Sequence, residues 1–253
     1  IAARQLKSIL AELQIAHDGL ITNRKRLTSK KIRVVANQQQ VVRVDRETRS
    51  EIDERTESRI LDAVQKRLPE ADALIVCDYG KGVVTQALLD GLRSICRSQG
   101  LWLSMDPKPV HRIRLNNLSL ITPNRKEVFA LAGLPDETYD SNPSKDKNLM
   151  RVAQILMDTL RPAMLLITLS EAGMLLCQRG KKPIHIPTMA QEVFDVSGAG
   201  DTVIGTFTMA VAGGASPIEA AIISNHAAGV VVGKVGTATV DPKELIASFA
   251  GGK

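Results

Sequence analysis

The residues best suited to chemistry stand in one short stretch, Phe194-Asp-Val-Ser-Gly-Ala-Gly-Asp-Thr202, which leads into a small, apolar run over residues 202–212. Gly198 and Gly200 permit backbone angles that other residues avoid, so the chain can turn sharply with several amide N–H groups pointing the same way. The apolar run is long enough for a helix, and a turn rich in N–H groups at a helix N-terminus binds anions. The stretch therefore predicts an anion hole formed by Gly198, Ala199 and Gly200.

Asp201 is unexpected beside an anion hole, because a carboxylate repels phosphate. One explanation is catalytic: the carboxylate takes a proton from the group that attacks the phosphate. The other is structural: the stretch is a glycine-rich turn between a strand and a helix, and Asp201 is the N-cap of that helix. The stretch by itself leaves both explanations open.

Length and composition limit the class of protein. With 253 residues, of which 44% are hydrophobic and 24% charged, the chain can bury a substantial core as one domain. Its three cysteines, Cys77, Cys96 and Cys177, are far apart in the sequence, which predicts reduced thiols in a cytoplasm rather than disulfides or a zinc site. No apolar stretch approaches the ~18 residues of a membrane span, so no membrane partner is expected.

The basic charge has two possible causes. A net charge of +6 and a pI of about 9.3 could serve nucleic acid or a small polyanionic substrate. The basic residues are mostly interspersed with acids, and aromatic residues, which stack on bases, make up only 3% of the chain. We therefore expect a small polyanionic substrate and no nucleic acid.

The middle of the chain alternates strands and helices. Residues 73–77 are almost wholly apolar, which is typical of a parallel strand buried on both faces, and residues 85–98 have the pattern of a helix. Alternation of this kind predicts a mostly parallel α/β sheet. Further strands are expected at 101–105, 118–121 and 164–168, a second sheet region at 173–176 and 183–187, strands within 19–45, and helices at 1–15, 51–67, 124–132, 146–160, 202–212 and 217–232.

Polar residues follow the ends of the predicted strands. Asp78 and Asp106 come directly after two of them, Asn124 closely follows a third, and Thr168 ends a fourth. In parallel α/β sheets, ligands bind at the carboxyl ends of the strands. These four residues are therefore expected at one functional edge.

The chain resembles the ribokinase-like (PfkB) carbohydrate kinases over nearly its whole length, and residues 195–202 resemble the C-terminal signature of that family. The resemblance implies a three-layer α/β/α kinase domain over residues 1–253, with a small β lid at about 20–45 and without the family's first strands. Within the family, the motifs most resemble those of the heptose 7-phosphate kinases. The other motifs are Asn37-Gln-Gln-Gln40, Arg43-Val-Asp45, Asp78-Tyr-Gly-Lys-Gly82, Asp106-Pro-Lys108, Thr122-Pro-Asn-Arg-Lys-Glu127, Thr168-Leu-Ser-Glu-Ala-Gly173 and Gly233-Lys-Val-Gly-Thr-Ala-Thr239.

This resemblance implies transfer of phosphate from ATP to C1 of D-glycero-D-manno-heptose 7-phosphate, on the route to ADP-heptose and lipopolysaccharide. The alternatives are another ribokinase-like sugar kinase, or a fragment that binds nucleotide but is inactive because the first strands carry sugar contacts. The partners expected are ATP, a sugar phosphate, a second copy in a homodimer, and a nucleotidyltransferase domain that is fused or separate.

The resemblance also implies roles around the nucleotide. Asn124 and Glu127 would help to hold Mg²⁺ through water, although their spacing also suits a capping box at a helix N-terminus. Asp195 and the loop of residues 236–237 would hold K⁺. Many relatives have Gly where Ser170 stands, and Asn225 could be an ordinary polar helix residue. The nucleotide contacts implied are Thr168, Ser170, Gly173 and Asn225.

On the acceptor side, the resemblance makes Asp201 the catalytic base. Asp106 and Lys108 would face the sugar, although Lys108 could equally be a surface lysine on a proline-containing turn. Lys31 and Arg33 match the lid strand and would lie near the 7-phosphate. The neighbouring basic residues 24–26 are better explained as charges that keep a hairpin edge from aggregating.

Overall fold

The computed structural model describes residues 2–36, 39–110, 113–190 and 193–250. The chain forms two compact units. The first comprises Ile1–Glu70 and Gly80–Ile95, and the second comprises Ala71–Tyr79 and Cys96–Lys253.

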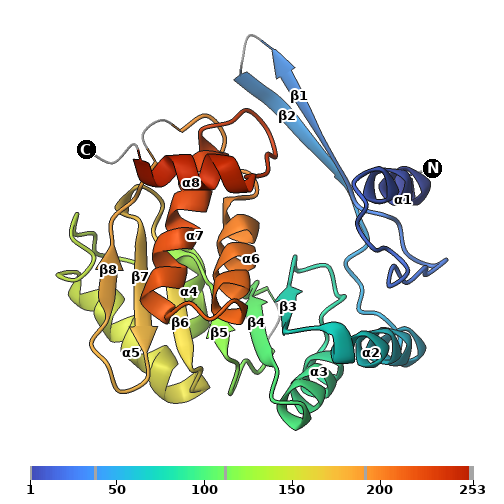
Figure 1. Ribbon diagram of the computed structural model, residues 1–253, viewed down its shortest axis with the longest axis horizontal. Coiled ribbons are helices and arrows are strands. Elements are labelled where there is room, and N and C mark those ends of the chain that lie inside the picture. The colour runs from blue at the N-terminus through green and yellow to red at the C-terminus, as the bar shows by residue number, and fades with distance from the viewer. Residues whose placement is uncertain (1, 37–38, 111–112, 191–192, 251–253) are drawn as a thin grey trace. The chain divides into compact units, whose positions relative to one another are not determined.

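A six-stranded sheet is the centre of the second unit (Figure 1). Its strands lie side by side in chain order. The first four are parallel to one another, and the fifth in this order, β7, is antiparallel to both of its neighbours, β6 and β8. A 3₁₀ turn, Ser170–Ala172, is enough to join β6 to β7 because antiparallel neighbours need no crossover. The strands are β3 (Ala73–Cys77), β4 (Trp102–Asp106), β5 (Leu120–Ile121), β6 (Met164–Thr168), β7 (Met174–Gln178) and β8 (Ile184–Ile186).

Helices cover both faces of this sheet. On one face α6 contacts β3 and β4, while α7 contacts β7 and β8, and these two helices pack on each other. On the other face α4 and α5 contact β6 (Figure 1). The sheet is therefore the middle of three layers. The helices are α4 (Arg125–Ala132), α5 (Lys147–Leu160), α6 (Ala199–Ala212), α7 (Pro217–Val232) and α8 (Pro242–Ala250), which packs on α7.

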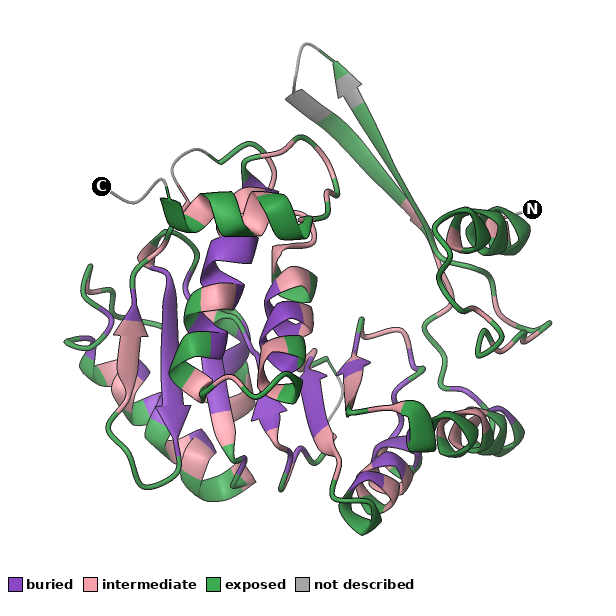
Figure 2. Cartoon of the chain, viewed as in Figure 1, coloured by how far each residue is buried: buried purple, intermediate pink, exposed green. Residues whose placement is uncertain are grey.

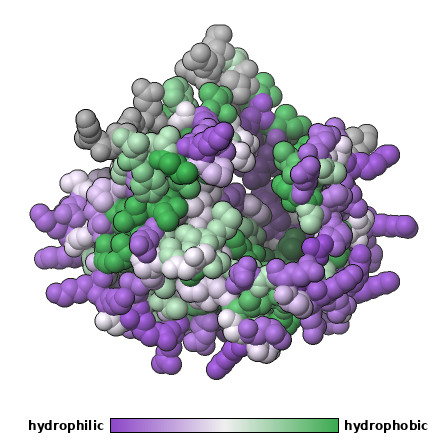
Figure 3. All heavy atoms as spheres, in the orientation of Figure 1, coloured by the Kyte–Doolittle hydropathy of each residue, from purple (hydrophilic) through white to green (hydrophobic). Residues whose placement is uncertain are grey.

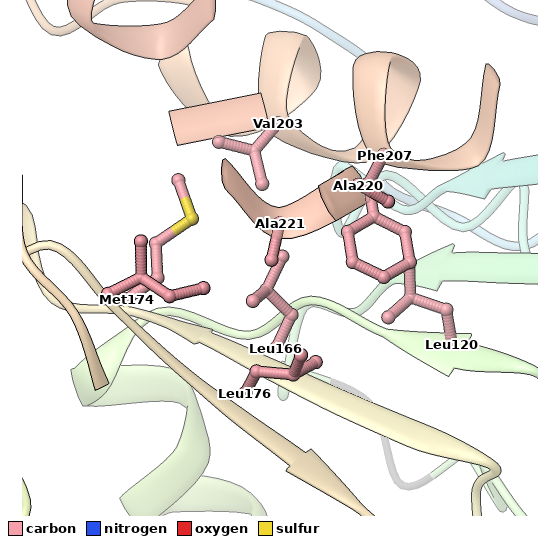
Figure 4. Packing of buried hydrophobic residues seen from close by; sticks show 9 residues of the cluster. Leu120, Leu166, Met174, Leu176, Val203, Phe207, Ala220 and Ala221 are labelled. Carbon is pink, nitrogen blue, oxygen red and sulfur yellow. The ribbon is translucent and has the colours of Figure 1, made fainter. Parts of the chain in front are cut away.

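An aliphatic core joins the sheet to α6 and α7 (Figure 4). Leu120, Leu166 and Leu176 from three strands and Phe207 from α6 are fully buried. Each such side chain stabilises the fold by about 1.5–3 kcal/mol through burial. Ala221 faces them from α7, where a small side chain lets the helix approach the sheet closely.

The first unit has helices and a hairpin. Asp53 caps α2 with a side-chain bond from Thr56 N, and α2 meets α3 where Gly91 leaves room for Leu61. Helix α1 buries no residue (Figure 2). The elements are α1 (Ala2–Glu12), the antiparallel pair β1 (Lys30–Ala36) and β2 (Gln39–Arg46), α2 (Glu54–Arg67), η1 (Leu68–Glu70) and α3 (Gln86–Ser98), whose last turn belongs to the second unit.

The α/β/α fold with a mostly parallel sheet is confirmed, but several local predictions were wrong. Strand β3 is not buried on both faces, because it stands at the end of the strand order, and only Val76 is buried. The predicted second sheet region is β7 and β8, which join the same sheet. The strands predicted within residues 19–45 are present as β1 and β2, and residues 37–38 of one motif lie outside the described residues.

Polar and charged side chains cover much of the face shown in Figure 3, with smaller apolar areas between them. Among the helices of the described residues, none has the length and hydropathy required to span a bilayer.

Candidate active site

Polar residues meet at the carboxyl edge of the parallel strands, as the sequence predicts. Asp106 ends β4, and its carbonyl accepts a hydrogen bond of 3.0 Å from the Asp78 N–H. Asn124 follows β5 and forms an isolated parallel bridge with Thr168 at the end of β6. Backbone pairing therefore brings these four positions, which are far apart in the sequence, to one edge.

The loop before α6 presents an uncapped helix N-terminus at this edge. Gly198 is the N-cap with a φ of 87°, and no side chain caps the helix. The first helical bond runs from Thr202 N–H to Gly198 C=O at 2.9 Å. Ala199 and Gly200 thus lie in the first turn, where amides lack helical acceptors. The Ala199 amide is partly engaged by the Val196 carbonyl at 3.3 Å.

Asp201 is the third residue of α6, and the interpretation of it as the N-cap was wrong. The helix begins three residues earlier than the apolar pattern predicts, because Gly198 supplies the left-handed turn that starts it. The Asp201 side chain is exposed, and its Oδ1 accepts a hydrogen bond of 2.9 Å from the hydroxyl of Tyr79.

Asp195 stands at the start of the same loop. Its Oδ1 accepts a bond of 2.8 Å from Ser197 N–H, and the preceding Phe194 N–H donates to the Val232 carbonyl of α7 at 2.8 Å. A side chain at Gly198 would lie 3.7 Å from the Thr237 methyl group, so the 236–237 loop is close to the N-cap. The two parts of the predicted K⁺ site are thus near the same turn.

Asn124 and Glu127 form a complete capping box at the start of α4. The Asn124 side chain accepts from Glu127 N–H at 3.0 Å, and Glu127 Oε2 accepts from Asn124 N–H at 2.9 Å. The structural explanation of this pair is confirmed. Glu127 Oε1 also forms an ion pair with the Nζ of Lys108, so Lys108 is not a freely solvated surface lysine.

Burial raises the pKa of Asp106 to about 7, and the nearby carboxylates of Glu127, Asp201 and Asp78 add to this effect, whereas Lys108 opposes it. Burial disfavours the charge on Lys108, but its bond to Glu127 and the carboxylate of Asp106 outweigh burial and raise its pKa. Asp106 therefore keeps its proton to a higher pH than an exposed aspartate does.

A pocket of about 520 Å³ lies beside the N-terminus of α6. It brings together all four of the residues predicted to contact nucleotide and two of the predicted anion-hole residues. The lining is mainly apolar with a few polar groups, which is typical of sites for small molecules. The lining residues are Thr168, Ser170, Glu171, Gly173, Met174, Thr188, Ala190, Val193, Val196, Ala199, Gly200, Val203, Asn225, Ala228, Gly229 and Val232.

Backbone geometry constrains two of the lining residues, Ser170 and Gly173, and a side-chain hydrogen bond fixes a third, Asn225. Ser170 has a φ of 52°, a conformation that favours Gly. A Cβ on Gly173 would lie 2.1 Å from the Ile186 carbonyl oxygen, so only Gly fits. Asn225 is buried, and its Nδ2 donates to the Pro187 carbonyl at 2.6 Å, which ties α7 to the strand β8 side of the pocket.

Sequence reasoning missed the apolar residues of the pocket and Tyr79. Val193 and Val196 remain 62% and 68% exposed at the pocket. A Cβ on Gly229 would approach Met189 C at 3.2 Å, and an isolated glycine in a helix could have indicated this close contact. Tyr79 lies in the motif of residues 78–82, but the sequence alone predicts no role for its side chain.

Lys31 and Arg33 lie in the first unit, whereas the site residues above belong to the second unit. Both are exposed on β1, where Lys31 stands opposite Asp45 and Arg33 opposite Arg43. Their predicted contact with the 7-phosphate stays a prediction.

Curated relatives match nearly the whole chain. The "Bifunctional protein HldE" of Geobacter sulfurreducens is 42% identical over 231 residues, which are 91% of this chain and 46% of the relative. The protein of the same name from Desulfatibacillum aliphaticivorans is 40% identical over 244 residues, 96% of this chain and 48% of the relative. The chain thus spans about half the length of the curated relatives it matches.

Solved structures share the fold at low identity. A ribokinase from Giardia lamblia superposes with a TM-score of 0.78 at 16% identity, covering 99% of this chain and 79% of that one. Phosphofructokinase-2 from Escherichia coli in complex with potassium gives 0.76 at 18% identity, covering 98% and 77%. Residues 2–244 match the family described as "pfkB family carbohydrate kinase". With its sheet edge, its signature loop and this match over most of its length, the chain belongs to the pfkB family of carbohydrate kinases.

Proposed function

We propose that the protein transfers the γ-phosphoryl group of ATP to the C1 hydroxyl of D-glycero-D-manno-heptose 7-phosphate. The observation that carries this proposal is the position of Asp201: a carboxylate in the first turn of an uncapped helix, next to a pocket of nucleotide size. Family membership supports sugar phosphorylation. The motifs shared with heptose 7-phosphate kinases support the choice of sugar.

The pocket suits the base and ribose of ATP. Apolar side chains such as Val193, Val196 and Val232 offer faces for an aromatic ring, and Asn225 supplies a polar group inside. The amides at the start of α6 lie at the edge of this pocket and carry the positive end of the helix dipole. In this arrangement the phosphates extend toward Asp201, where transfer takes place.

Asp201 acts on the acceptor. The proton of the C1 hydroxyl passes to the Asp201 carboxylate while the hydroxyl oxygen forms a bond to the γ-phosphorus. The bond between the γ-phosphorus and the bridging oxygen breaks, and ADP leaves with its electron pair. The amides of Gly198, Ala199 and Gly200 stabilise the charge on the transferring group.

The residues present fit a magnesium ion held mainly by ATP. Within the described residues, no group of three or more His, Cys, Asp or Glu side chains is placed to hold a metal. Both oxygens of Glu127 are engaged, one by Asn124 N–H and one by Lys108. Glu127 and Asn124 would therefore contact the ion through its water ligands. When bound, Mg²⁺ neutralises the phosphate charge that develops during transfer.

The acceptor side rests on charge. Asp106 and Lys108 would bind the sugar near C1, and Lys31 and Arg33 would bind its 7-phosphate. Asp195 with the 236–237 loop would hold K⁺, and the structure of phosphofructokinase-2 in complex with potassium supports the choice of ion. Cytoplasmic location, a homodimer, and a fused or separate nucleotidyltransferase domain stay predictions.

The test is an acceptor panel with the full-length protein, MgATP, and heptose 7-phosphate, ribose, fructose 6-phosphate or adenosine. We expect the highest kcat/KM for heptose 7-phosphate, with ³¹P NMR showing a new phosphate on C1. Ribose and fructose 6-phosphate test the alternative of another ribokinase-like kinase, which the structural neighbours support. A preference for an unphosphorylated sugar would overturn the choice of substrate. Turnover of no acceptor by the full-length protein would favour the inactive alternative.

A further inference from the structure

We infer that Tyr79 is a positioning residue for the catalytic carboxylate: its hydroxyl holds one oxygen of Asp201 so that the other is presented to the acceptor. This inference rests on the proposed function, because it assumes that Asp201 is the base. The carrying observation is the bond of 2.9 Å from Tyr79 Oη to Asp201 Oδ1.

The fold places Tyr79 for this task. It follows β3 directly after Asp78, whose backbone is fixed by the bond to Asp106. Strand β3 contacts α6, the helix that carries Asp201. Tyr79 lies two residues beyond the end of β3 and Asp201 lies in the first turn of α6, so the bond links the ends of two packed elements of the second unit.

The Tyr79 ring is not a core residue, since the side chain is 53% exposed. The chain has only two tyrosines, one tryptophan and four phenylalanines. An aromatic residue left at a polar edge, with its hydroxyl on the predicted base, is better explained by that bond than by packing.

The hydroxyl is always the donor in this pair. Burial and the bond to the adjacent Asp201 carboxylate raise the pKa of Tyr79, so the hydroxyl stays protonated over the working pH range. The bond therefore holds Asp201 in one orientation, with its second oxygen directed away from Tyr79.

Other titratable groups face the pair. Asp106 lies close to Tyr79, and Lys108 interacts with Asp201. Glu127 and Asp78 influence Asp106. All of these side chains remain in Tyr79→Phe, which removes the bond of the hydroxyl to Asp201 together with its interaction with the Cys77 thiol.

The experiment measures kcat, KM and the melting temperature of Tyr79→Phe in the full-length protein with MgATP and heptose 7-phosphate. We expect kcat to fall about tenfold, with little change in KM for ATP or in the melting temperature. The ring is retained, so a packing role would leave kcat at the wild-type value. A wild-type kcat would overturn the inference.

Tyr139→Phe is the matched control. Tyr139 is also exposed, its hydroxyl bonds a carboxylate, Glu171, at 3.4 Å, and its ring lies beside Arg125. Loss of its hydroxyl should leave kcat near the wild-type value, and a fall equal to that of Tyr79→Phe would overturn the inference.

Asp201→Asn separates the two failures. If Asp201→Asn destroys turnover but Tyr79→Phe behaves as wild type, only the Tyr79 inference fails. If Asp201→Asn is itself nearly normal, Asp201 is not the base, and the proton-transfer step of the proposed function fails together with the Tyr79 inference.

Discussion

Two helix N-termini at the same edge of the sheet use the same sequence position in opposite ways. In α4 the third residue, Glu127, turns back and accepts from the N-cap amide of Asn124 at 2.9 Å. In α6 the third residue is also an acid, Asp201, but it accepts from Tyr79, and the N-cap is Gly198 with no capping side chain. In α4, side chains of the helix itself bond the amides of its first turn. In α6, amides of the first turn and the Asp201 carboxylate are left for a ligand.

Helix α7 shows that the closed arrangement is the ordinary one in this protein. Its N-cap Ser216 and third residue Glu219 form a box as complete as that of α4, with Glu219 accepting from Ser216 N–H at 2.8 Å. Helix α6 differs from α4 and α7 at two positions of this pattern. Its N-cap is a glycine without a capping side chain, and its third residue is an aspartate, which is one methylene shorter than the glutamate of the other two helices. The difference indicates that α6 has been shaped for binding and chemistry rather than for helix stability.

The largest expected effect is that of Asp201→Asn. If the carboxylate is the base, kcat should fall by about 10²- to 10⁴-fold, which is roughly 2.7–5.4 kcal/mol of barrier. ATP affinity should hold or improve slightly, because a negative charge near the γ-phosphate is removed. Glu219→Gln changes the acid at the same position of α7 and should leave kcat unchanged. A nearly normal kcat for Asp201→Asn would remove the difference between the two helices.

The second prediction concerns Asp106, which interacts with acids from both helices. Because burial raises its pKa to about 7, the folded chain binds a proton there that the unfolded chain has released above pH 4. The free energy of unfolding of the wild type, relative to Asp106→Asn, should therefore fall by up to about 1.4 kcal/mol per pH unit from pH 4 to 7, and level off above. Urea unfolding at several pH values measures this, and parallel curves for the two proteins would contradict it.

The fold and much of this edge could be predicted because they depend on local patterns. Apolar runs give the strands, and parallel strands must carry Asp106 and Thr168 at the same edge. The contact between Tyr79 and Asp201 joins residues 122 positions apart, and no local pattern encodes it.

Two other features were lost for a similar reason. Val193 and Val196 have no chemical signature, and only the folded chain shows that they stay exposed beside the pocket. The apolar run of β3 could not reveal that this strand stands at the end of the order, since strand neighbours are a property of the whole sheet.

Gly198→Ala tests the open N-terminus directly. At a φ of 87° an alanine is strained by about 1–2 kcal/mol, although its Cβ has room, 3.7 Å from Thr237. Gly214, just beyond the other end of α6, has a φ of 93° with nothing near its Cβ, so Gly214→Ala should lose similar stability. Only Gly198→Ala should weaken ATP binding, by calorimetry, since it alone reorients the amides. Equal ATP affinity in both variants would contradict a phosphate site there.

The smallest effect is expected at the closed N-terminus of α4. Asn124→Ala removes the side chain that accepts from Glu127 N–H at 3.0 Å, and should lower the free energy of unfolding by about 1 kcal/mol. Ser216→Ala breaks the equivalent box of α7 and should cost a similar amount.

The two variants should differ in their metal dependence. If Asn124 and Glu127 also contact Mg²⁺ through water, Asn124→Ala should require several-fold more Mg²⁺ for half-maximal kcat, because loss of the cap frees Glu127 to move. Ser216→Ala should titrate with Mg²⁺ as the wild type does. Asn124→Ser restores a capping oxygen on a shorter side chain, so it should recover the stability without recovering the full Mg²⁺ response. Identical Mg²⁺ titrations for all three variants would reduce the role of α4 to capping alone, and the contrast with α6 would then be complete.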